Sequence, residues 1–129
     1  MDFALRCSHL QKVHYISTAF IAGTFKGVFS ECDLDVGQGF NNTYEQSKFE
    51  AECLVREYYN SRFQIAIYRP SIVVGEYETG ETNNFNMFYQ PFRSLSLGYF
   101  EKIPIDPETV LNIVPCDAAA KAVALLGAE

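Results

Sequence analysis

Short apolar runs that are rich in β-branched and aromatic residues recur along the chain and predict strands. The three clearest runs are at 12–17, 63–68 and 111–114, and a shorter apolar run at 72–75 follows the second. Arg69-Pro70 ends the second run, because proline cannot donate a hydrogen bond to a strand ladder. The stretch at 23–42 holds four glycines and two asparagines without a sustained hydrophobic period, so it is expected to form a loop.

Helix signals fall between the predicted strands. Thr43 followed by Gln46 predicts a capping box that opens a helix at 43–59, which ends at 60–61. Further predicted segments are a short helix at 3–10, a loop at 76–86, a partly helical stretch at 87–100 that Pro91 interrupts, a turn with a helix cap at 115–117 and a helix at 118–126. Strands that alternate with helices predict an α/β fold with a parallel sheet, in which sites lie beyond the carboxyl ends of the strands.

The composition narrows the class of protein. At 129 residues and 14.6 kDa the chain is expected to be a single domain spanning 1–129, and 48% hydrophobic residues are enough for a folded core. A net charge of −6 without a cluster of basic residues argues against nucleic acid as a partner. Because neither a secretory leader nor an apolar run of membrane length is recognised, we expect a cytoplasmic protein without a membrane span.

The cysteines and histidines do not indicate a metal centre. The four cysteines form no CxxC pair, and the two histidines, His9 and His14, lack the further ligands that tetrahedral zinc needs. We therefore expect reduced thiols and no metal site.

The predicted helix at 43–59 carries an unusual cation. At 100° per residue, one side of this helix collects Tyr44, Lys48, Ala51, Val55, Tyr58 and Tyr59. The other side collects Glu45, Gln46, Glu50, Arg56 and Glu57. The first side is therefore expected to be buried, with the Lys48 ammonium one turn from the Tyr44 hydroxyl. A lysine whose ammonium reaches water at the start of the helix is the structural alternative.

An ammonium close to a phenol has a chemical use. It stabilises the phenolate and lowers the tyrosine pKa from about 10, which brings Tyr44 within reach of general acid and base catalysis near neutral pH. Ser17-Thr18 stands at the carboxyl end of a predicted strand, where parallel strands and the next helix border the same crevice, and Thr18 is the catalytic candidate. Its hydroxyl is placed to complete the site, and an ordinary strand-end hydroxyl is the alternative.

Three segments together resemble the extended short-chain dehydrogenase/reductase superfamily. In the order and spacing of that superfamily they are YISTAFIAG at 15–23, NTYEQSKFEAE at 42–52 and YRPSIVVG at 68–75, and NIVPCDA at 112–118 resembles a later segment. The sequences STAF, NTYEQSK and GEYETGET resemble those of the thioester reductase and fatty acyl reductase branch, also called the male-sterility type. The fold that this resemblance implies is a partial Rossmann-like parallel sheet with flanking helices.

The resemblance implies an NAD(P)-dependent oxidoreductase that reduces an acyl thioester or a related carbonyl by hydride transfer. Thr18 would orient the carbonyl, Tyr44 would exchange a proton with its oxygen, and Lys48 would lower the Tyr44 pKa while binding the nicotinamide ribose. The residues implied to bind the cofactor, NADP or NAD, are Tyr44, Lys48, Pro70, Ser71, Ile72 and Val73. The implied partners are this dinucleotide and a small-molecule or acyl-carrier-bound substrate. A sugar-nucleotide or sterol-type epimerase or dehydrogenase of the same superfamily is the alternative.

The glycine-rich half that opens a full member of this superfamily is not recognised in the sequence. Gly37-Gln38-Gly39 is followed by Asn42 where a third glycine should fall, and it precedes the Tyr44 helix instead of following a first strand. The chain is therefore expected to be the carboxyl-side part of an NAD(P)-binding domain with one bare sheet edge, for which the missing amino-terminal half or a homo-oligomer is the expected partner. A catalytically inactive remnant or partner-binding module is the non-enzymatic alternative.

Overall fold

The computed structural model describes residues 2–59, 64–85, 87–103, 105–106 and 108–128. The chain forms two compact units, one of residues 1–71 with 126–129 and one of residues 72–125. The strands pair in parallel and alternate with helices, which confirms the predicted α/β class. The parallel sheet expected from the sequence is present as two two-stranded sheets, one in each unit.

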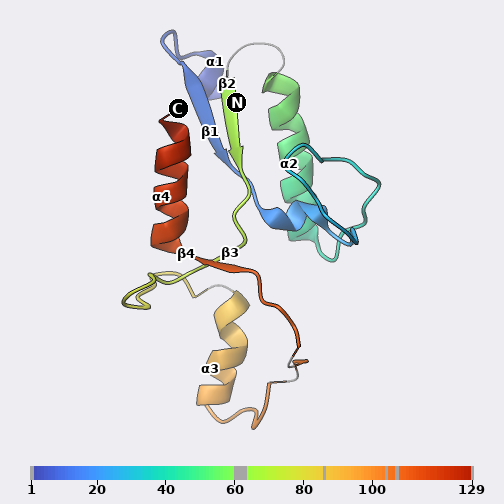
Figure 1. The fold of residues 1–129 in the computed structure, drawn as a ribbon, viewed down its shortest axis with the longest axis vertical. Coiled ribbons are helices and arrows are strands. Elements are labelled where there is room, and N and C mark those ends of the chain that lie inside the picture. Colours follow the sequence, from blue (N-terminus) through green and yellow to red (C-terminus); the bar gives the residue numbers. More distant parts are fainter. Residues whose placement is uncertain (1, 60–63, 86, 104, 107, 129) are drawn as a thin grey trace. The chain divides into compact units, whose positions relative to one another are not determined.

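The first unit is built on β1 (Lys12–Ile16) and β2 (Gln64–Tyr68), which pair in parallel with Lys12 opposite Gln64. Both strands were predicted, and both are short and mostly half-buried. Figure 1 shows the two strands running toward the end of the unit at which α2 (Thr43–Tyr59) begins. The carboxyl ends of the strands therefore meet the amino end of α2, as expected for a parallel α/β arrangement.

The ladder between the two strands continues past their ends. The N–H of Ser17 donates to the Tyr68 carbonyl at 2.7 Å, and the N–H of Ala19 donates to the Pro70 carbonyl at 2.9 Å. The chain then turns into a 3-10 helix, η1 (Ala19–Ala22), which packs against α2. Backbone hydrogen bonds thus hold the segment after β1 against the segment after β2.

Helix α2 spans the predicted residues but begins with a different cap. Oδ1 of Asn42 accepts the Glu45 N–H at 2.9 Å, and the Glu45 carboxylate accepts the Asn41 N–H at 2.8 Å. The capping box predicted at Thr43 and Gln46 is wrong by one residue, because Thr43 is already the first helical residue. The structure does not describe the predicted helix end at 60–61, Phe63 or the side chains of Tyr58 and Tyr59.

The buried side of α2 differs from the prediction. Tyr44 is 54% exposed, whereas Glu45 is 6% exposed and Glu52 is completely buried. Val55, which is 5% exposed, lies on the predicted side and is buried as expected. The prediction placed Glu45 toward solvent and assigned Glu52 to neither side, whereas a carboxylate can be buried where its oxygens are hydrogen-bonded or ion-paired.

Two arginines surround the buried carboxylate of Glu52. It lies 2.7 Å from Nη2 of Arg69 and 3.3 Å from Nε of Arg56. Arg69 also donates to the carbonyls of Ser30 and Asp33, at 3.0 and 2.6 Å. Arg56 donates to three carbonyls of the loop at 30–33, those of Glu31, Cys32 and Asp33. A buried charge is tolerated only with such partners, so this network ties together α2, the end of β2 and the loop at 30–33.

The loop at 23–42 contains no helix or strand, as predicted. The Gln38 side-chain amide closes it by donating to the carbonyls of Ile21 at 3.0 Å and Leu34 at 2.8 Å. Gly23 has a φ of +53°, and a Cβ at this position would collide with the carbonyl oxygen of Gly39. The loop returns so closely on itself here that only glycine fits at its start.

In the second unit, β3 (Ile72–Val74) and β4 (Ile113–Pro115) pair in parallel. The strand predicted at 111–114 begins two residues later and includes Pro115. After β3, the N–H of Tyr77 donates to Oδ1 of Asp117 at 3.1 Å, and this bond holds the pKa of the Asp117 carboxyl below its usual value.

The aromatic-rich segment of the second unit is helical in part, as predicted. A short 3-10 turn, η2 (Met87–Tyr89), leads into α3 (Gln90–Ser96). The prediction that Pro91 interrupts this helix is wrong. Pro91 lies in the first turn of α3, where its missing N–H removes no bond within the helix.

The last helix, α4 (Cys116–Gly127), begins two residues before the predicted one. At the other end of the chain, α1 (Asp2–Leu5) is shorter than the helix predicted at 3–10. Among the residues described, none of the helices combines the length and the apolar character needed to cross a membrane.

We expect Gly23→Ala to destabilise the first unit more than Gly37→Ala. Both glycines have positive φ, +53° and +77°, but nothing lies within 4 Å of a Cβ placed at Gly37. The control is therefore expected to lose about 1 kcal/mol from backbone strain, and Gly23→Ala about 1 to 3 kcal/mol more from the collision with Gly39. Urea unfolding measures both free energies, and equal losses would contradict the close approach.

A pH dependence is expected from Asp33, whose carboxylate accepts the N–H and the hydroxyl of Ser30, both at 2.7 Å. These bonds lower the Asp33 pKa, so the carboxyl adds stability above its unfolded pKa and loses this contribution as the pH falls through the folded pKa. From about pH 5 to about pH 3, the free energy of unfolding should therefore fall further in the natural chain than in Asp33→Asn. In the control, Glu31→Gln, the free energy of unfolding should fall with pH as it does in the natural chain. Parallel curves for the natural chain and Asp33→Asn would refute this role.

Candidate active site

Thr18 lies immediately beyond β1, as predicted, and the backbone engages its hydroxyl. The residue is 4% exposed. Its Oγ1 accepts the Phe20 N–H, which caps η1, and donates to the Pro70 carbonyl, each at 3.3 Å. To donate to a substrate, the hydroxyl must turn away from Pro70. Both distances are long for a hydroxyl, so we expect this exchange of partners to cost little.

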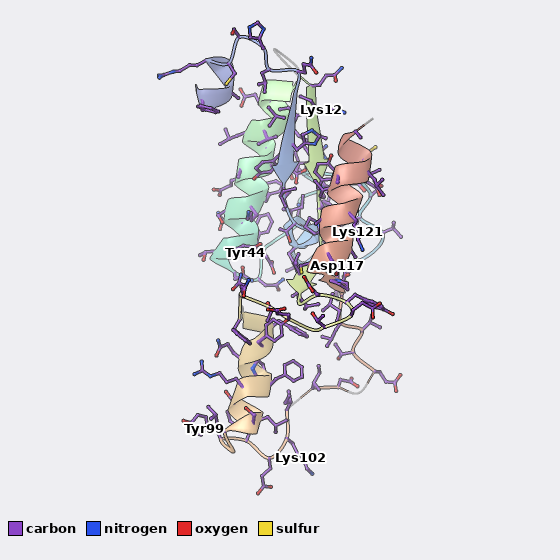
Figure 2. The ribbon with its side chains drawn as sticks, turned by 90° about the vertical axis from the view of Figure 1, so that its left-hand side faces the viewer. Lys12, Tyr44, Tyr99, Lys102, Asp117 and Lys121 are labelled. Atoms are coloured by element: carbon purple, nitrogen blue, oxygen red, sulfur yellow. The ribbon has the colours of Figure 1, made fainter. Side chains whose placement is uncertain are left out.

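Tyr44 and Lys48 lie one turn apart near the amino end of α2. Nζ of Lys48 is 6.0 Å from the centroid of the Tyr44 ring, at the outer limit of a cation–π contact. Tyr44 is exposed and Lys48 is half-buried. Figure 2 shows Tyr44 at the lower end of α2, far from Lys12, which begins β1. The phenol is therefore accessible at the end of the unit where the parallel strands finish.

The fold brings Thr18 to the same end of the first unit as Tyr44 and Lys48. Thr18 caps η1, and η1 packs against α2. Figure 1 shows η1 lying against the amino-terminal part of α2. A threonine hydroxyl, a phenol and an ammonium thus border one region of this unit.

The predicted nicotinamide-lining residues fall in both units. Pro70 and Ser71 follow β2 in the first unit, whereas Ile72 and Val73 are the first two residues of β3 in the second. The Ile72 N–H donates to the carbonyl of Asn112 at 3.2 Å, which holds the start of β3 beside the chain that enters β4. Among these four residues, Pro70 is the one whose carbonyl accepts a hydrogen bond from a catalytic candidate, Thr18.

Two further hydroxyl groups belong to this region, that of Tyr15, which was not singled out from the sequence, and that of Ser17, which was placed beside Thr18 at the strand end. Burial raises the pKa of Tyr15, and its electrostatic interactions with Glu52 and with Tyr44 raise it further. Ser17 is buried, and its Oγ has no hydrogen-bond partner among the residues that the structure describes. The spacing of two between Tyr15 and Ser17 was the available signal, because alternate side chains of a strand point to the same face.

The donor set suits the nicotinamide end of a dinucleotide. The Lys48 ammonium and the Tyr44 hydroxyl offer hydrogen bonds of the kind that ribose hydroxyls accept. Tyr44 is the second residue of α2, so a negative charge on its oxygen would lie near the positive end of the helix dipole. The groups present therefore fit a site for acid and base chemistry beside such a cofactor.

Comparison with known proteins places the chain in a family. Residues 1–123 match the family described as Male sterility protein, a family of NAD-binding domains. The large subunit of L-2-aminoadipate reductase from Eremothecium gossypii is 33% identical over 123 residues, which are 92% of this chain and 9% of that protein. A nonribosomal peptide synthetase of Aspergillus hancockii is 36% identical over 66 residues, 50% of this chain and 6% of that protein. The chain thus spans less than a tenth of either relative.

A solved structure supports the fold. The reductase domain of the aureusimine biosynthetic cluster aligns with a TM-score of 0.68 at 24% identity, over 89% of this chain and 32% of that domain's chain. This likeness confirms the predicted Rossmann-like α/β class. The match over 1–123 confirms the resemblance to the male-sterility type that the sequence motifs indicated. The chain belongs to the Male sterility protein family of NAD-binding domains.

Proposed function

We propose that the chain belongs to an NAD(P)-dependent oxidoreductase that reduces an acyl thioester or a related carbonyl by hydride transfer. The observation that carries this proposal is the Tyr44 and Lys48 pair, one turn apart at the accessible amino end of α2. Thr18 borders the same end of the unit, and the chain is a member of an NAD-binding family. The relatives named above include an L-2-aminoadipate reductase.

The chain's own groups would handle the carbonyl and its proton. A bound nicotinamide dinucleotide supplies the hydride, which adds to the carbonyl carbon. Tyr44 gives its proton to the carbonyl oxygen, and departure of the thiol leaves an aldehyde. Thr18 orients the carbonyl by donating to its oxygen once its hydroxyl has left Pro70. Lys48 and the helix dipole offset the negative charge that develops on the Tyr44 oxygen.

The remaining assignments concern binding. The cofactor is proposed to lie against Tyr44, Lys48, Pro70, Ser71, Ile72 and Val73. The likeness to a nonribosomal peptide synthetase supports an acyl substrate held on a carrier. The alignment with about a third of a solved reductase domain supports the proposal that the chain is part of one NAD(P)-binding domain. The order of its motifs supports the proposal that this is the carboxyl-side part.

Tyr44→Phe is expected to remove turnover and to leave cofactor binding nearly intact. The variant loses only the phenolic hydroxyl, and loss of a general acid costs about 10²- to 10⁴-fold in rate. The intact gene product is assayed with acyl thioesters and each reduced nicotinamide cofactor by nicotinamide absorbance, and cofactor binding is followed by fluorescence. Tyr99→Phe, at a side chain 73% exposed, is the matched control. Equal turnover in Tyr44→Phe and the natural chain would remove Tyr44 from the mechanism.

Lys48→Ala is expected to weaken both turnover and cofactor affinity, because one ammonium is proposed to offset the phenolate charge and to bind the ribose. Loss of a hydrogen bond from a charged group costs about 1.5 to 3 kcal/mol, which corresponds to a rise of about 10- to 150-fold in the cofactor Kd. Lys121→Ala is the control, since that side chain is 77% exposed on α4. A loss confined to turnover would be inconsistent with the ribose-binding role.

A further inference from the structure

Helix α2 carries three polar side chains at a spacing of four residues, namely Tyr44, Lys48 and Glu52. Four residues advance about 40° around a helix, so the three positions share one side of it. Tyr44 and Lys48 form the proposed proton-transfer pair, and Glu52 is completely buried in an ion pair one turn further on. The helix that presents the proton donor therefore also holds a charged anchor.

The partner of this anchor, Arg69, is fixed from several directions. Its Nε lies 3.2 and 3.3 Å from the two carboxylate oxygens of Glu52, and its Nη2 lies 2.7 Å from one of them. It donates to the carbonyls of Ser30 and Asp33, and its guanidinium carbon is 5.3 Å from the ring centroid of Phe29. These contacts require the planar fork of an arginine, which a lysine ammonium does not reproduce.

Pro70 links Arg69 to the catalytic candidates. It follows Arg69 directly, and its carbonyl accepts the Ala19 N–H at 2.9 Å and the Thr18 hydroxyl at 3.3 Å. Neighbouring Cα atoms are about 3.8 Å apart and the proline ring fixes φ, so the Pro70 carbonyl carbon cannot shift far unless the Arg69 backbone moves. The two hydrogen bonds that this carbonyl accepts hold its oxygen. The position of Thr18 is therefore coupled to the buried ion pair, and the Ala19 N–H bond keeps this coupling when the Thr18 hydroxyl turns to the substrate.

We propose that Arg69 and Glu52 are positioning residues that set the separation between the Thr18 hydroxyl and the Tyr44 phenol. For its catalytic consequence this inference rests on the proposed oxidoreductase function. Arg56 provides the comparison. It pairs with the same carboxylate and binds carbonyls of the same loop, but it lies on α2 itself and has no covalent link to Pro70.

The kinetic test is a double-mutant cycle in the intact gene product. Arg69→Lys is expected to lower kcat about 10- to 100-fold and to change the cofactor KM by less than about threefold, as when a reacting group moves by about 1 Å. In a Thr18→Val background the same substitution should cost less than about threefold, because the group that it positions is gone. Arg56→Lys, the matched control, should have the same effect in both backgrounds. Equal losses from Arg69→Lys in both backgrounds would overturn the proposal.

Amide hydrogen exchange gives a readout that needs no turnover. Arg69→Lys is expected to raise exchange at Ala19 about tenfold or more, because the acceptor of that N–H is the Pro70 carbonyl. Arg56→Lys should raise exchange only in the loop at 30–33. Unchanged exchange at Ala19 would overturn the proposal. Glu52→Gln keeps the shape of the side chain without its charge, and it must raise exchange at Ala19 as Arg69→Lys does. If Arg69→Lys does not fold, Glu52→Gln replaces it in the test.

The two proposals fail in different ways. If the natural chain oxidises neither reduced nicotinamide cofactor with any acyl thioester, the proposed function fails, and exchange at Ala19 alone then decides whether Arg69 positions the segment after β1. If turnover is present and depends on Tyr44, but Arg69→Lys is additive with Thr18→Val, the proposed function stands and the positioning role is excluded.

Discussion

The first unit depends on one buried carboxylate. Glu52 is inaccessible to solvent, and its charge is tolerated because Arg69 and Arg56 pair with it and use their other donors on the carbonyls of the loop at 30–33. Removing one member of such a group leaves an uncompensated charge, which costs about 3 to 5 kcal/mol. The ion pair therefore helps to determine where the chain runs after β2 and how the long loop before α2 is held.

The proposed chemistry uses the outer end of the same helix. α2 is anchored in its middle through Glu52 and presents Tyr44 and Lys48 at its accessible amino end. The threonine that would face the substrate is held by the carbonyl that follows Arg69. This division agrees with a general property of enzyme sites, in which rigid, buried contacts fix groups that must themselves stay accessible.

The strands, the 43–59 helix and the loop before it were predictable, because apolar periodicity and turn residues are local signals. The cap was misplaced by one residue because Asn42 and Thr43 are both good capping residues, and only the geometry distinguishes Glu45 from Gln46 as its partner. The burial of Glu52 was not predictable from hydropathy, since its partner Arg69 is 17 residues away and reaches it only in the folded chain. The exposure of Tyr44 was also missed, because the projection around the helix placed its aromatic ring on the side expected to be buried. Its membership of the candidate site was proposed from the motif.

The central claim is that this chain takes part in hydride transfer to an acyl carbonyl, and it is tested most directly by following the hydride. The intact gene product is incubated with an acyl thioester and a reduced nicotinamide cofactor that carries deuterium at the transferable position, and the product is analysed by mass spectrometry. The account predicts deuterium on the former carbonyl carbon. A reduced product without deuterium from either prochiral form of the cofactor, or cofactor that stays reduced beside unchanged thioester, would contradict it.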